Sequence, residues 1–210
     1  QDRRANARER AALLARVCEA VQHAHGRGVI HRDLKPENIL VEINSSQEAT
    51  PKVLDFGLAS IIGGASTSRL AFAGTPAYMA PELLRGETIT PDVRGDVYAL
   101  GAIGYELLMG RPPAVSGGMT LPEALAAVDS FDPRPDLAAH GDLGAIVLRA
   151  MQRDPAERYQ SSAELAADLR RLLAGEPITV RANEPLYMLR MAAKRRPVLS
   201  AVIAATATTL

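Results

Sequence analysis

Residues 31–40 read HRDLKPENIL, with one His, two basic residues, an Asp, a Glu and an Asn within eight positions. Val29-Ile30 precedes the stretch, and the apolar triplet ILV closes it at residue 41. A loop that only connects two elements has no need for so many unlike polar groups between two apolar segments. The stretch is therefore a candidate active-site loop, and the surrounding sequence can be searched for the parts that would complete such a site.

Short strands are expected on both sides of this loop. Val29-Ile30 predicts a short buried extended segment, and residues 39–43 and 52–54 are strand candidates. The polar INSSQEAT between the two candidates predicts the loop of a β-hairpin. The polar stretch therefore leads directly into a predicted hairpin.

Helices are expected to make up most of the rest. Residues 7–26 predict a helix because Leu14, Val17, Cys18 and Val21 recur at i, i+3, i+4 and i+7, on one face. The expected fold class is α+β, with a few short strands early and mainly helices afterwards. Four further helices are expected over 97–109, 121–128, 143–151 and 161–173.

Two of these helices begin with capping signals. Asp96 is placed to cap the 97–109 helix, which is apolar on nearly every side and is expected to be buried. Residues 161–164, SSAE, form a capping-box pattern, and Gly175 marks the end of that helix. Residues 57–80 show no clear period, which predicts a long loop of the kind that is usually functional or mobile.

Composition excludes several function classes. The 24 basic and 24 acidic residues give a net charge of zero, so no nucleic-acid partner is expected. Cys18 is the single cysteine, which leaves no internal disulfide, favours a reducing compartment and predicts a small buried apolar residue. His23 and His25 lie two positions apart on a helix and do not share a face, which argues against a metal site there.

Three motifs follow one another along the chain: HRDLKPEN at 31–38, DFG at 55–57 and APE at 80–82. In this order and spacing they make the chain resemble the large lobe of a eukaryotic-type (Hanks-type) serine/threonine protein kinase, from about residue 7 to residue 174. The resemblance implies a protein-kinase-like fold, with a partial kinase domain over 1–174 that is mainly helical and carries a short catalytic-loop β-hairpin.

The resemblance also implies catalytic roles, with ATP and Mg²⁺ as cofactors. Asp33 would accept or orient the proton of the attacking hydroxyl, and Asn38 and Asp55 would hold Mg²⁺ through hard oxygen ligands. Lys35 would neutralise the γ-phosphate and bind the nucleotide, and Thr75 is expected near Asp33 and Lys35, as in kinases specific for Ser and Thr. The alternative for the three Mg²⁺ and base positions is ordinary loop capping.

Further positions would support this loop. By resemblance, His31 is expected to stack on Phe56 rather than take part in catalysis. Glu82 is expected to pair with Arg158 in DPAERYQS, and Asp96 to accept hydrogen bonds from the backbone of residues 31–32.

A regulatory site is expected between DFG and APE. In kinases with an Arg at position 32, a phosphate on the activation loop pairs with it, and Ser66, Thr67 and Ser68 are the candidates here. Phosphorylation by another copy would make a homodimer one of the partners, beside ATP and protein substrates carrying Ser or Thr. The alternative is an unregulated loop rich in Ser and Thr.

Half of the nucleotide site is not found in these residues. Leu40 is expected to form the floor of the nucleotide pocket, but the sequence contains no G-x-G-x-x-G. The three lysines are Lys35 in the catalytic loop, Lys52 before DFG, and Lys194, so none lies upstream of the loop to contact the α- and β-phosphates. The small lobe is therefore expected to be absent, and the chain to be a fragment that is nearly inactive alone. A lobe-only pseudokinase is the alternative.

The last part of the chain differs from the rest. Residues 175–196 are expected to be a basic juxtamembrane linker ending in Lys194-Arg195-Arg196, and 197–210 to begin a transmembrane helix that the chain end truncates. Basic residues before the span would place the kinase domain in the cytoplasm, anchored to the cell membrane by one span, as in bacterial transmembrane kinases. The alternatives are an apolar tail that packs on the domain, and a membrane-anchored docking module without catalysis.

Overall fold

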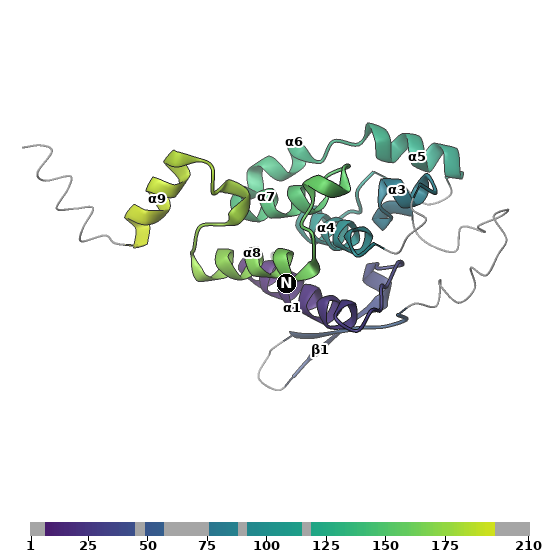
Figure 1. Cartoon of the computed structure of the whole chain (residues 1–210), viewed down its shortest axis with the longest axis horizontal. Helices are drawn as coiled ribbons and strands as arrows, with labels where there is room; N and C mark the ends of the chain where they lie inside the picture. Colours follow the sequence, from purple (N-terminus) through teal and green to yellow (C-terminus); the bar gives the residue numbers. More distant parts are fainter. Residues whose placement is uncertain (1–6, 45–48, 57–75, 88–91, 115–118, 196–210) are drawn as a thin grey trace, which may run out of the picture.

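Helix α4, Arg94–Met109, forms the centre of the fold. Its residues from Gly95 to Tyr105 are buried without a break, so the helix is covered on every side, as its sequence predicts. The helices that pack against it are α1 (Ala7–His25), α7 (Gly141–Ala150) and α8 (Ser162–Ala174). α1 also packs along α8, which closes the core (Figure 1).

The structure is a computed structural model of the 210-residue chain, and it describes residues 7–44, 49–56, 76–87, 92–114 and 119–195. In Figure 1 the hairpin lies beside α1, and α9 lies at the opposite end of the helical body from α3 and α5. The remaining helices of the described residues are α3 (Pro81–Leu84), α5 (Leu121–Ser130), α6 (Arg134–Leu137) and α9 (Pro185–Arg195), with 3-10 turns at Pro36–Asn38, Pro76–Tyr78, Ala138–His140, Pro155–Glu157 and Thr179–Arg181.

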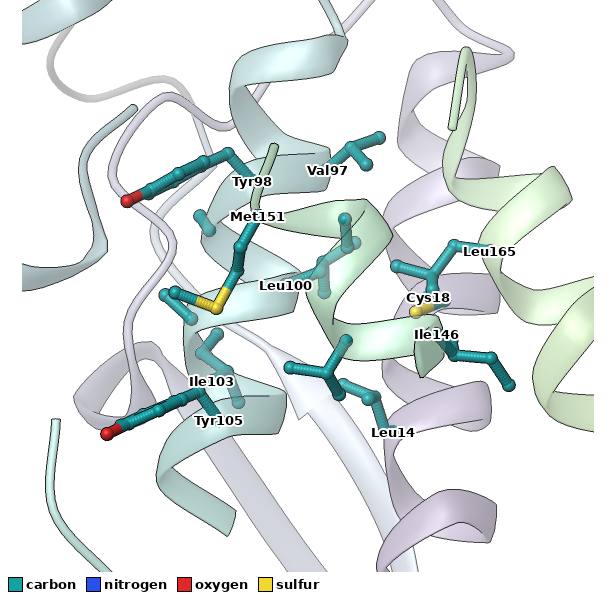
Figure 2. Close-up of a cluster of buried hydrophobic side chains, with 14 of the residues drawn as sticks. Leu14, Cys18, Val97, Tyr98, Leu100, Ile103, Tyr105, Ile146, Met151 and Leu165 are labelled. Carbon is teal, nitrogen blue, oxygen red and sulfur yellow. The ribbon is translucent and has the colours of Figure 1, made fainter. Parts of the chain in front are cut away.

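The core confirms the predicted apolar face of α1. Leu14, Val17, Cys18 and Val21 are each exposed by 2% or less. Burial raises the pKa of the Cys18 thiol far above its ordinary value, so this cysteine is an inert apolar residue. Figure 2 shows Leu14 and Cys18 facing the side chains of α4 and α7.

Two glycines of α4 allow its neighbours to approach closely. A Cβ atom on Gly101 would lie 2.8 Å from the Cβ of Ala150 in α7, and one on Gly104 would lie 2.9 Å from Leu14. Larger side chains at these positions would force the three helices apart. The two glycines therefore set the distance of α4 from α1 and α7.

The hairpin forms, but with different bounds from those predicted. β1 spans Ile39–Ile43 and pairs antiparallel with β2, Ala49–Val53, with Ile39 opposite Val53. β2 begins earlier than expected because Ala49 and Thr50, assigned to the loop, continue the ladder opposite β1. The prediction of a buried extended segment at 29–30 is wrong. Val29 is 40% exposed, and its N–H caps the end of α1 by donating to the Ala24 carbonyl.

The predicted cap of α4 is also wrong. The helix begins at Arg94 with Val93 in the capping position, and Asp96 lies inside the first turn, where its carboxylate turns toward another part of the chain. At α8 the capping box is half formed. Ser161 accepts from the Glu164 N–H, but the Glu164 carboxylate accepts from Gln160 rather than from Ser161.

The folded unit continues beyond residue 174, into the segment expected to be a linker. Ile178 is fully buried and Tyr187 is 8% exposed. Thr179 donates from both its N–H and its hydroxyl to the buried carboxylate of Asp168 in α8. Burial acts to raise the pKa of Asp168, but hydrogen bonds from Thr179 and Tyr159 outweigh it and lower the pKa.

The predicted membrane segment at 197–210 lies outside the described residues. Among the helices that the structure does describe, none combines the length and the apolar character needed to cross a bilayer.

Candidate active site

The polar loop at 31–38 is fixed to the centre of the fold by Asp96. One carboxylate oxygen, Oδ2, accepts from the N–H of His31 and the other, Oδ1, from the N–H of Arg32, both at 2.8 Å. Arg32 has a φ of 68°, a left-handed conformation that side chains other than glycine rarely adopt. The expected contact is therefore present, and it holds a strained backbone next to Asp33.

His25 is a third partner of this carboxylate. Its Nε2 lies 2.7 Å from Asp96 Oδ2, with the His25 side chain 4% exposed and that of Asp96 2%. The sequence reasoning treated His25 only as an improbable metal ligand and missed this contact. The two residues are 71 positions apart, and no local pattern connects them.

Asp33 is the carboxylate at the centre of the loop. Lys35 Nζ donates to Asp33 Oδ2 at 2.8 Å, and the Asn38 amide donates to the Asp33 backbone carbonyl at 2.8 Å. The Asp33 side chain remains 35% exposed. The carboxylate is thus held at one oxygen and open to an incoming hydroxyl, which general-base chemistry requires.

His31 connects this loop to the end of β2. Its Nε2 lies 2.9 Å from the Leu54 carbonyl, which can only accept, whereas its Nδ1 faces the N–H of Asp33 at 3.3 Å. The partners therefore fix the neutral tautomer with the proton on Nε2. The ring also lies against Phe56, with centroids 4.9 Å apart and planes tilted by 56°, so the expected contact is present as a tilted pair rather than a parallel stack.

Asn38 and Asp55 are brought together by the hairpin. Ile39 pairs with Val53, and the Leu54 N–H donates to the Asn38 carbonyl at 2.8 Å, so the two candidate ligands flank one end of the ladder. Asp55 is exposed and has a left-handed φ of 59°.

Asn38 and Asp55 are a suitable ligand pair for Mg²⁺, but two side chains are too few for a metal whose ligands all come from the protein. Both side chains offer hard oxygen ligands, and Mg²⁺ commonly uses one or two of these together with substrate phosphates. In the described part of the chain, no group of three or more His, Cys, Asp or Glu residues could form a complete metal site. A magnesium ion here would therefore take the rest of its coordination from nucleotide oxygens and water.

Glu82 and Arg158 form the predicted ion pair. Arg158 Nη1 and Nη2 each donate to one Glu82 oxygen at 2.7 Å, and the Arg158 side chain is fully buried. Its other donors reach the backbone carbonyls of residues 94, 152 and 153, and its guanidinium lies 5.0 Å from the centroid of Tyr98. Burial raises the pKa of Tyr98 to about 12, so the ring stays neutral.

Of the other predicted site residues, the structure describes two and leaves four outside the described residues. Leu40 lies on β1 and is 49% exposed, so it is available to a ligand. Arg32 is exposed beside the loop. Thr75 and the candidate phosphorylation sites Ser66, Thr67 and Ser68 lie outside the described residues. A cavity of about 430 Å³ between α5 and α7 lies away from this loop and includes none of these positions.

Replacing Arg158 with Ala is expected to destabilise the protein by about 3–5 kcal/mol, because it leaves the Glu82 carboxylate and three backbone carbonyls without their partner. Urea denaturation would measure the loss. Arg134→Ala is the matched control, since Arg134 pairs with Asp132 on the surface, and its effect is expected to stay within about 0.5 kcal/mol. Equal stabilities of the two variants would show that the buried pair contributes nothing.

Asp96→Asn is expected to loosen the loop while leaving the core packed. The amide keeps one acceptor oxygen but presents an NH₂ group to the N–H donors of the loop. Hydrogen exchange of the His31 and Arg32 amides should then accelerate by roughly tenfold or more. Asp132→Asn, on the surface, should leave these two amides unchanged. Unaltered protection in Asp96→Asn would contradict the anchoring role.

Comparisons with known proteins agree with this geometry. Residues 1–166 match the protein kinase domain family. The chain is 41% identical over 172 residues to serine/threonine-protein kinase PknB of Mycobacterium tuberculosis, which covers 79% of this chain and 26% of that protein. PknB of Mycolicibacterium smegmatis is 40% identical over 171 residues, which cover 78% of this chain and 26% of that protein. PknB of Mycobacterium leprae is 39% identical over 171 residues, which cover 79% of this chain and 26% of that protein.

The chain thus spans about a quarter of the length of these relatives. In the described residues, a helical body with one two-stranded sheet forms a partial kinase-like fold. The chain belongs to the protein kinase domain family, among the eukaryotic-type serine/threonine kinases.

Proposed function

We propose that these residues form the catalytic large lobe of a serine/threonine protein kinase that transfers the γ-phosphate of ATP to Ser or Thr hydroxyls of proteins. The observation that carries the proposal is the Asp33 carboxylate, held by Lys35 at 2.8 Å and open on its other side. The names of the relatives support the choice of Ser and Thr as acceptors.

The residues of the loop have distinct tasks in this reaction. Asp33 accepts the hydrogen bond of the acceptor hydroxyl and takes its proton as the oxygen attacks phosphorus. Lys35 places a positive charge beside that carboxylate and the transferred phosphoryl group. Asn38 and Asp55 would hold Mg²⁺, which neutralises phosphate charge when bound. Phosphoryl transfer depends mainly on such positioning, which fits a loop anchored on the buried Asp96.

The nucleotide site needs more than these residues supply. A Gly-rich loop and a strand lysine that contact the phosphates are not found in the 210 residues. The exposed Leu40 of β1 would form part of the floor onto which a small lobe closes. We therefore expect these residues alone to bind ATP weakly and to turn it over poorly.

The proposal extends to membrane attachment and to a partner. The uncharged run at 197–210 after a basic cluster would anchor the kinase domain to the cell membrane from the cytoplasmic side. A second copy would serve as the substrate for phosphorylation in trans.

Asp33→Asn in the full-length gene product is expected to lower the rate of phosphate transfer by roughly 10²-fold or more, because the general base is lost. Incorporation of labelled phosphate into a Ser/Thr protein substrate measures it. Glu42→Gln is the control, since Glu42 pairs with the exposed Lys52 on the hairpin. Undiminished transfer by Asp33→Asn would refute the assigned base, and a wild-type protein with no transfer would favour a docking module.

Active protein is expected to carry phosphate on Ser66, Thr67 or Ser68, where it would pair with the Arg32 guanidinium. Mass spectrometry of protein incubated with ATP should find the modification, and the same incubation of Asp33→Asn should lack it. Full activity with all three positions unmodified would contradict this form of regulation.

A further inference from the structure

α9 exposes large apolar side chains although it is anchored to the domain. Leu186 is 81% exposed, Leu189 68% and Met188 38%, and Ala192 is also exposed. On the other side of the same helix, Tyr187 is buried and Met191 packs against the core. The buried side of α9 accounts for its docking on the domain. We call the opposite, exposed side the α9 face; it consists of Leu186, Met188, Leu189, Arg190 and Ala192. The docking does not explain why this face is apolar.

The helix is held in a defined position. Arg181 donates to Asp142 of α7 at 3.0 Å and to Glu184 at 2.7 Å. The Tyr187 hydroxyl donates to the other Asp142 oxygen at 3.1 Å and accepts from the N–H of Ile178. The α9 face therefore points in one direction relative to the kinase domain, as a fixed surface rather than the side of a free tail.

The charged residues from position 185 onward all have one sign, and the preceding Glu184 is paired with Arg181. Residues 185–210 contain Arg190, Lys194, Arg195 and Arg196 and no acidic residue. Arg190 is exposed beside the apolar side chains. Helices that combine an exposed apolar face with basic residues bind the surface of bilayers, where the apolar side chains enter the headgroup region and the basic ones meet anionic lipids.

We propose that the α9 face lies on the surface of a lipid bilayer that contains anionic phospholipids, and so holds the kinase domain in a fixed orientation on the membrane. A second copy of the chain fits less well, because symmetric pairing of two such faces would bring Arg190 near its own copy. The proposal does not depend on the assigned catalysis, and it concerns a different segment of the sequence from the run at 197–210.

A fluorophore at the α9 face tests this in the full chain. Cys18 is fully buried, so a cysteine introduced by Ala192→Cys would be labelled selectively. Vesicles of phosphatidylcholine with phosphatidylglycerol should shift the emission of an environment-sensitive dye to the blue. Vesicles of phosphatidylcholine alone should act at least several-fold more weakly, and added salt should reduce the difference. Ala163→Cys, an exposed alanine at the first turn of α8, is the control that should not respond.

Variants separate the α9 face from the apolar run that follows it. Leu186→Ser with Leu189→Ser should weaken the response of the Ala192→Cys label roughly tenfold or more, because two inserting side chains are lost. Ile43→Ser, which removes an equally exposed side chain from the hairpin, should leave it unchanged. Arg190→Glu should weaken binding to anionic vesicles only.

Three results would overturn the proposal. Equal responses to both kinds of vesicle, insensitive to the leucine substitutions, would mean that only the run at 197–210 binds. A shift that depends on protein concentration without vesicles would identify a second copy as the occupant. An equal response of the Ala163→Cys label would indicate unspecific adsorption. Asp33→Asn should bind vesicles like the wild type, so a failure of the proposed catalysis would not affect this outcome.

Discussion

The carboxylate of Asp96 is the constraint on which the catalytic loop depends. A buried charge is costly unless hydrogen-bond donors surround it, and here the donors are two backbone N–H groups of the loop and the ring of His25. Because Asp96 lies in the first turn of the central helix, the loop inherits the rigidity of the core. The left-handed backbone at Arg32 can persist only because this contact determines it.

The site is assembled from elements that have no rigidity of their own. A two-stranded hairpin is at best marginally stable alone. Here it packs on α1, and His31 joins its end to the loop through the carbonyl of Leu54. The distances around Asp33 thus follow from α1, which directly precedes the loop, and from α4, whose Asp96 lies 65 positions beyond His31. The helical body fixes the position of the loop, so the few side chains of the loop are sufficient to position the reacting groups.

Sequence reasoning predicted the contacts that motifs encode and missed those that only tertiary packing creates. The pair of Glu82 and Arg158, 76 positions apart, was predicted because both occupy motif positions. His25 was not, because its contact with Asp96 depends on how α1 crosses α4. Asp96 itself was predicted correctly as a partner of the loop and wrongly as a helix cap, since a carboxylate satisfied by a distant backbone is not available to its own helix. The docking of residues 178–187 was missed because a single buried Ile and Tyr give no periodic signal.

The surroundings of Arg158 also explain the choice of residue at that position. All five of its N–H donors are used, two on a carboxylate and three on backbone carbonyls that approach from different directions. A lysine would preserve the charge but carries its three donors on one atom, and so could not reach all these acceptors. What position 158 requires is therefore a rigid, branched shape, and the positive charge alone would not join α3 to the turns at 152–153 and the start of α4.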